Sequence, residues 1–80
     1  MYHVYILRSL ADISQWYVGF TDDLEARLSQ HNAGDSPHTA KHRPWELVSA
    51  ISFADRHRAL AFERYLKSGS GRAFAARHLR

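Results

Sequence analysis

Apolar residues are concentrated in three short runs whose patterns are typical of β-strands. Residues 2–7 are β-branched or aromatic almost throughout, which predicts a central strand covered on both faces. Residues 16–20 follow a polar turn at 9–15 and predict the second strand of an antiparallel hairpin. Residues 45–53 alternate well enough to predict a third strand, whose core side is expected to hold Trp45, Leu47, Ile51 and Phe53.

A first helix is expected directly after the second strand. Asp22 is a good N-cap residue and stands three positions before Glu25, so the helix is expected to begin within one residue of Asp22. Leu24 and Leu28 define its buried side. The Asn-Ala-Gly sequence at 32–34 is a typical signal for its end.

The last third of the chain predicts two more helices. Asp55 is expected to cap a helix that runs to about Lys67, with Ala59, Phe62 and Leu66 on its buried side. The Ser-Gly-Ser-Gly sequence at 68–71 is expected to break the chain. Residues 72–80 then predict a short final helix.

Two basic residues of the first helix lie one turn apart at the margin of its apolar side. Arg27 and His31 are both close to the direction that Leu24 and Leu28 define. Desolvating a cation at such a margin is costly unless an anionic group meets it. A phosphate group would meet that requirement.

The hairpin and the second helix add further candidate residues. If Tyr5 and Tyr17 share a face of the sheet, the bare backbone at Gly19 leaves a hollow beside two phenols. The alternative is that both tyrosines are ordinary core aromatics with satisfied hydroxyl groups. Glu63 lies in the apolar stripe of the second helix, where it either reaches water, pairs with Arg27 or binds a metal ion.

Composition limits the class of protein. Eighty residues suffice for one domain, spanning residues 1–80, and for one small core. The absence of cysteine excludes disulfides and thiolate chemistry and suits the cytoplasm. No signal peptide or membrane span is recognisable, so the protein is expected to be soluble. The net charge is +3, and nine of the eleven cations are Arg, which favours nucleic acid as the partner.

A basic loop precedes the third strand. It contains Lys41, His42 and Arg43 and is expected to face DNA, with a solvated linker as the alternative. His38 and His42 have the spacing of two metal ligands on a helix, but the flanking Pro37 and Pro44 argue against a helix there.

The order and spacing of the singled-out residues resemble the GIY-YIG nuclease family, and in particular its small stand-alone bacterial members. The resemblance covers nearly the whole chain and rests on Val4-Tyr5, Tyr17-Val18-Gly19, the Arg27 and His31 pair, and Glu63. His3 stands where the first motif has Gly, and Phe20 stands where some members have Lys. Membership implies an α+β fold with a small three-stranded antiparallel sheet flanked by helices.

The resemblance also implies a mechanism. A single Mg²⁺ or Mn²⁺ ion is expected on Glu63, with Arg27 stabilising the charge that develops on a phosphodiester of DNA. Tyr5 or Tyr17 is expected to take the proton of the attacking water, with His31 as a relay or a phosphate contact. This predicts an endonuclease of low sequence specificity in DNA repair or processing, without a small-molecule cofactor. The alternative is a nucleic-acid-binding module that has lost turnover, and the oligomeric state is left open.

Overall fold

A three-stranded antiparallel sheet forms the centre of the molecule. The computed structural model describes every residue from Met1 to Arg80 and confirms the three expected strands. β1 (Tyr2–Ser9) is the middle strand, with β2 (Trp16–Thr21) on one side and β3 (Trp45–Phe53) on the other. The β1–β2 pair is the expected hairpin, because the chain turns back between Ser9 and Trp16.

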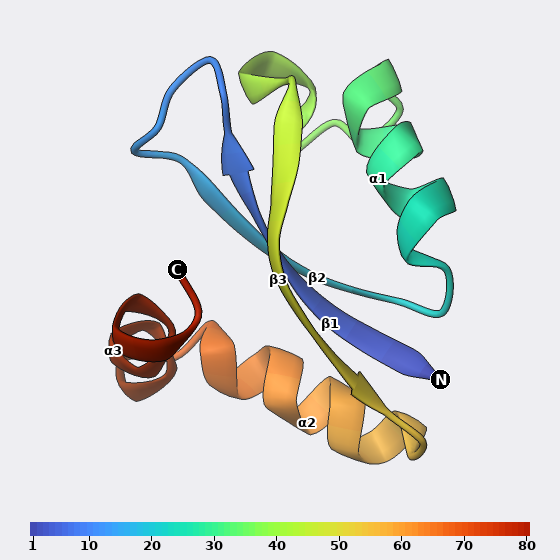
Figure 1. The fold of residues 1–80 in the computed structure, drawn as a ribbon, viewed down its shortest axis with the longest axis vertical. Helices are drawn as coiled ribbons and strands as arrows, with labels where there is room; N and C mark the ends of the chain where they lie inside the picture. The colour runs from blue at the N-terminus through green and yellow to red at the C-terminus, as the bar shows by residue number, and fades with distance from the viewer.

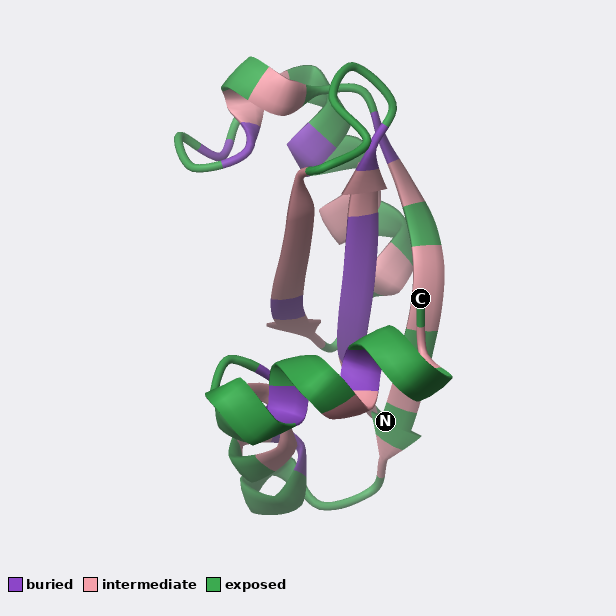
Figure 2. Ribbon diagram, turned by 90° about the vertical axis from the view of Figure 1, so that its left-hand side faces the viewer, coloured by how far each residue is buried: buried purple, intermediate pink, exposed green.

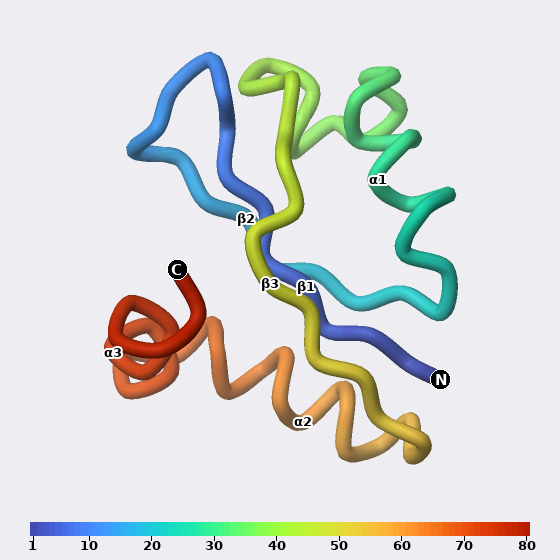
Figure 3. Tube along the Cα trace, viewed as in Figure 1, coloured from blue at the N-terminus to red at the C-terminus, as the bar shows by residue number.

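Helices cover both faces of this sheet (Figure 1). α1 (Leu24–Ala33) packs on one face, and α2 (Arg56–Leu66) and α3 (Gly69–His78) pack on the other. A short 3-10 helix, η1 (Ala40–His42), lies in the loop before β3. The chain trace in Figure 3 shows α1 and α2 approaching the crossed strands from opposite sides. None of the helices combines the length and the apolar character that a bilayer crossing requires.

β1 supplies side chains to two separate cores because consecutive residues of a strand face opposite ways. Val4 and Ile6 pack against α2 and α3, in a cluster completed by Ala59, Leu66 and Ala75. Tyr5 and Leu7 face α1 and form the second cluster with Trp45. Figure 2 shows β1 as the buried strand between two partly exposed neighbours. This confirms the prediction of a central strand covered on both faces.

An irregularity in β3 corrects the prediction that its large apolar residues share one side. Ile6 pairs with Ser49 but Leu7 pairs with Leu47, so Val48 is an extra residue in β3. Trp45 and Leu47, before Val48, therefore face α1, whereas Ile51 and Phe53, after it, face α2. Trp45 packs with the α1-side cluster, Phe53 packs with the α2-side cluster, and Leu47 is 42% exposed.

α1 begins and ends close to the expected positions. Its N-cap is Asp23, whose carboxylate accepts from the backbone N–H of Ala26 at 3.1 Å. The N-cap is therefore the residue after Asp22, and the helix itself begins at Leu24, one residue later than expected. Gly34 ends it in the left-handed conformation with φ of 84°, as the Asn-Ala-Gly signal indicates.

The predicted break at residues 68–71 is only a helix boundary. Ser68 caps α3 by accepting from the N–H of Gly71 at 3.2 Å, so the helix already includes both glycines. A Cβ on Gly71 would lie 1.7 Å from the carbonyl oxygen of Tyr65, at the end of α2. Gly71 thus lets the two helices meet closely, and the expectation of a helix confined to 72–80 is wrong at its start.

Candidate active site

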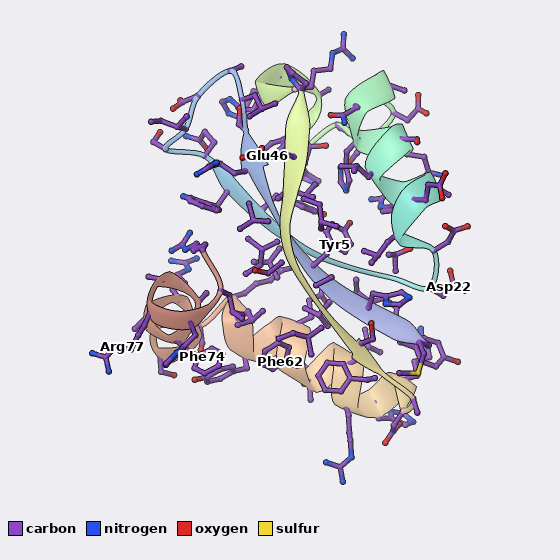
Figure 4. All side chains as sticks on the ribbon, viewed as in Figure 1. Tyr5, Asp22, Glu46, Phe62, Phe74 and Arg77 are labelled. Carbon is purple, nitrogen blue, oxygen red and sulfur yellow. The ribbon has the colours of Figure 1, made fainter.

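The phenol of Tyr5 and the imidazole of His31 meet in the space between the sheet and α1. Tyr5 is 2% exposed and His31 is completely buried. The Tyr5 hydroxyl oxygen lies 2.9 Å from Nε2 of His31, and the two rings are arranged edge to face. Figure 4 shows Tyr5 at the middle of the molecule on the side of the sheet that α1 covers. β1 and the last turn of α1 therefore bring together two residues that are far apart in the sequence.

The other ring nitrogen of His31 is held by Thr39. Nδ1 lies 2.7 Å from Oγ1 of Thr39, which is itself completely buried. The Thr39 hydroxyl also lies 3.4 Å from the carbonyl oxygen of Ser36, which can only accept a hydrogen bond. Both nitrogens of His31 thus have protein partners, which leaves neither free for a metal ion or a phosphate.

Two further residues fix the loop that carries Thr39. The indole N–H of Trp45 donates to the carbonyl oxygen of Thr39 at 2.8 Å. The side-chain amide of Asn32 accepts from the N–H of Trp45 at 2.6 Å and donates to its carbonyl oxygen at 3.1 Å. The sequence identified Asn32 only as a helix-end residue and gave Thr39 no role. A polar residue in an irregular loop carries no periodicity that would predict its partner.

Tyr17 lies on the same face as Tyr5, as the hairpin register requires. Its ring centroid is 6.3 Å from that of Tyr5 and 5.0 Å from that of His31. Gly19 pairs directly with Tyr5, and a Cβ there would lie 2.3 Å from the Tyr5 hydroxyl oxygen. The expected hollow at Gly19 is therefore not open, because the Tyr5 ring fills it.

Arg27 remains a charged and accessible group beside these phenols. It is half-buried on α1, and its Nη1 donates to the side-chain oxygen of Gln30 at 3.0 Å. The adjoining Tyr5 phenol raises the pKa of Arg27, so the guanidinium stays protonated. No carboxylate forms an ion pair with it. A phosphate could therefore approach Arg27 without displacing an acidic partner.

Burial changes the proton affinities of Tyr5 and His31 in a coherent way. It raises the pKa of the Tyr5 phenol, and Arg27 offsets only part of that effect. It lowers the pKa of the His31 imidazole, and the charge of Arg27 lowers it further. At neutral pH the pair is therefore a protonated phenol beside a neutral imidazole.

Glu63 is on α2, on the other side of the sheet from α1. It pairs with Lys67, whose Nζ lies 3.2 Å from Oε2 of Glu63, and not with Arg27. The charge of Glu63 contributes to the raised pKa of Tyr5, so the carboxylate acts on the phenol electrostatically. No group of three or more metal-ligating side chains exists in the chain. A single carboxylate nevertheless fits Mg²⁺, which often binds through one or two carboxylates, waters and substrate phosphates.

The basic loop is separate from this cluster in its contacts. Lys41, His42 and Arg43 make no hydrogen bond or ion pair with the two tyrosines, His31, Arg27 or Glu63. Arg43 donates to the carbonyl oxygen of Ala33 at 3.2 Å and so caps the end of α1. The His42 ring packs edge to face on Trp45. Lys41 is the one member of the three with an exposed side chain and no such partner.

Comparison with known proteins identifies the family to which the chain belongs. The family description of the GIY-YIG catalytic domain matches residues 1–75. The chain therefore belongs to the GIY-YIG catalytic domain family.

Individual relatives are small bacterial proteins and parts of larger eukaryotic ones. A UPF0213 protein of Lacticaseibacillus paracasei is 42% identical over 67 residues, which are 82% of this chain and 73% of that protein. The structure-specific endonuclease subunit SLX1 of Podospora anserina is 45% identical over 69 residues, 79% of this chain but only 20% of that protein. The solution structure of a UPF0213 protein from Bacillus halodurans matches with a TM-score of 0.56 and 28% identity, over 95% of this chain and 83% of that one.

Proposed function

We propose that this protein is a metal-dependent endonuclease that hydrolyses phosphodiester bonds of DNA. The observation that carries the proposal is the buried Tyr5–His31–Thr39 hydrogen-bonded chain with a charged, unpaired Arg27 beside it. A proton relay next to a guanidinium without an acidic partner suits the attack of water on a phosphodiester. The name of the SLX1 relatives supports the nuclease class.

Proton transfer runs through Tyr5 to His31 in this proposal. As a water oxygen bonds to phosphorus, the Tyr5 oxygen takes the water proton and passes its own hydroxyl proton to Nε2 of His31. A raised pKa of Tyr5 and a lowered pKa of His31 keep the two partners in the protonation states that this step needs. Nε2 must carry no hydrogen, which holds if Nδ1–H donates to Thr39 and the Thr39 hydroxyl donates to the Ser36 carbonyl oxygen.

Arg27 stabilises the negative charge that develops on the non-bridging phosphate oxygens. Its guanidinium presents several N–H donors in a fixed plane, which suits phosphate oxygens. Tyr17 forms the wall of the site beside His31.

Glu63 is the residue that would hold a single Mg²⁺ or Mn²⁺ ion together with the substrate. Such an ion, when bound, neutralises charge at the leaving 3′ oxygen. Without a metal ion, Lys67 pairs with Oε2 of Glu63. Binding of a metal ion would replace this exposed ion pair by a metal–carboxylate contact.

Contacts to phosphate carry no sequence information, so we propose low sequence specificity. Lys41 is the residue of the basic loop that is best exposed for such a contact, while Arg43 is engaged in capping α1. The proposed location is the cytoplasm, which suits a chain without cysteine. The proposed role is in DNA repair or processing.

A nucleic-acid-binding module without turnover is the second candidate. It is favoured by the raised pKa of Tyr5 and by the Lys67 side chain already seated on Glu63. This candidate predicts salt-dependent DNA binding that is unaffected by metal ions and no cleavage under any condition.

Cleavage assays with an Arg27 variant separate these two functions. Branched, single-stranded and duplex DNA would be incubated with protein in Mg²⁺, Mn²⁺ or chelator. Arg27→Ala is expected to reduce cleavage by roughly 10²- to 10³-fold, the usual cost of losing one stabiliser of transition-state charge. Arg64→Ala, an exposed arginine on α2, is the matched control and should retain activity. Equal activity of both variants, with unchanged circular dichroism, would overturn the proposal.

A further inference from the structure

A groove lies on the sheet face opposite Tyr5 and His31, between the hairpin and the facing ends of α2 and α3. Its volume is about 530 Å³. Apolar side chains of Ile6, Val18 and Leu66 form part of its lining, and Trp16 adds an aromatic wall. In Figure 1 the C-terminal end of the chain lies between α3 and this side of the sheet.

Three cations and no acidic residue belong to the lining of this groove. They are Lys67 at the end of α2, Arg72 on α3 and Arg80 beyond α3. Neither arginine forms an ion pair, and the guanidinium of Arg80 lies 4.8 Å from the Trp16 ring centroid. Two arginines without counterions, beside a lysine that pairs with Glu63, favour an anionic occupant of the groove.

The placement of these cations suits a chain of phosphates. Lys67 lies at the end of α2, Arg72 lies on α3, and Arg80 lies beyond the end of α3 against Trp16, so the three come from different positions around the groove. Different members of this set could contact successive phosphates of a nucleic-acid strand. The apolar residues of the lining could contact sugars and base edges.

Two residues that line the groove also contact residues of the candidate active site. Tyr17 lines the groove and also packs on His31 with ring centroids 5.0 Å apart. Lys67 lines the groove and pairs with Glu63. A strand whose phosphodiester lies between Arg27 and Glu63 would therefore pass into the groove along the free edge of β2.

We propose that this groove, with Arg72 and Arg80, binds the phosphate backbone of the nucleic-acid strand beyond the point of cleavage. The proposal rests on the proposed function for the identity of the strand. It adds a binding site that lies on the opposite face of the sheet from Tyr5 and His31.

The test compares two double variants with equal loss of charge. Arg72→Gln with Arg80→Gln removes the groove cations, and Arg64→Gln with Arg77→Gln removes two exposed arginines outside it. Figure 4 shows Arg77 pointing away from the body of the protein, and neither control residue lines the groove. Binding of a fluorescein-labelled single-stranded 20-mer would be measured by anisotropy in chelator, over a range of salt concentrations.

The groove variant is expected to bind more weakly, and its slope of log affinity against log salt should shrink by about 0.7 for each lost phosphate contact. The control variant should keep the wild-type slope. Equal slopes for the two variants would overturn the groove proposal while leaving the nuclease proposal intact. Absence of DNA binding and cleavage by the wild type would instead overturn the proposed function, so the two failures are distinguishable.

Discussion

The two faces of the sheet use side chains of the same central strand in different ways. On the α2 and α3 face, β1 contributes Val4 and Ile6 to a cluster of apolar side chains. On the α1 face, it contributes Tyr5 to a buried hydrogen-bonded chain that continues through His31 and Thr39. No buried side-chain polar atom in the protein lacks a hydrogen-bond partner.

This difference indicates that one face of the sheet mainly stabilises the fold, while the other holds the groups proposed for catalysis. Apolar burial is non-directional and gains free energy in proportion to area, so the α2 and α3 face is the main source of stability. A buried polar chain contributes less net free energy but fixes the orientation of each group. We therefore expect substitutions on the first face to affect folding and substitutions on the second to affect cleavage.

Leu66→Ala and Tyr5→Phe test that division most severely. Leu66 is 2% exposed, so its truncation is expected to cost about 2–5 kcal/mol of unfolding free energy by removing contacts and leaving a cavity. The remaining folded protein should still cleave.

Tyr5→Phe should cost less, about 1–3 kcal/mol for an unsatisfied His31 nitrogen, but should abolish cleavage. Urea unfolding and DNA cleavage at low temperature provide both measurements, and the reverse ranking in either would contradict the division.

Thr39→Val sharpens the comparison within the polar face. Valine keeps the shape but removes the partner of Nδ1, so we expect His31 to lose its fixed tautomer and cleavage to fall by roughly 10- to 100-fold. Thr39→Ser keeps the hydroxyl and should stay near the wild-type rate. Nitrogen-15 NMR of the His31 ring identifies which nitrogen carries the proton. A wild-type imidazole protonated on Nε2, or equal rates for the valine and serine variants, would refute this role.

The pH dependence of stability provides the mildest test, because the expected contribution of His31 is small. The folded-state pKa of His31 is lowered, so below the ordinary value near 6.5 the unfolded chain binds more protons than the native protein. The contribution of His31 to stability is therefore complete above that pH and is lost as the pH falls below it, by at most about 1.4 kcal/mol per pH unit. His31→Gln should flatten the dependence of the unfolding free energy on pH between roughly 7 and 5. An unchanged slope in this variant would assign the dependence to other groups.

The sequence predicted those features that depend on local chemistry. Strand positions follow from runs of β-branched and aromatic residues, and the end of α1 follows from Gly34. The sequence left open whether Tyr5 and Tyr17 share a face, and the register of the hairpin in the structure places them on the same one.

Features that depend on distant contacts were missed. The extra residue Val48 shifts β3 between faces, and nothing in its own alternation marks it. Gly71 was interpreted as a helix breaker because its tight contact with Tyr65 is invisible in the sequence. Thr39 acquires its role only when the loop folds over the last turn of α1.

Metal-dependent nicking by the wild type and Glu63→Gln tests the central proposal most directly. Supercoiled plasmid would be incubated with each protein in Mg²⁺, Mn²⁺ or chelator, and urea unfolding would be measured in parallel. We expect the wild type to nick only with metal and the variant to show background activity in all three conditions. The variant should unfold within about 0.5 kcal/mol of the wild type, because Glu63 loses only an exposed pair with Lys67 one turn away. Nicking by the wild type in chelator, or by Glu63→Gln within about threefold of the wild-type rate, would contradict a metal role for Glu63.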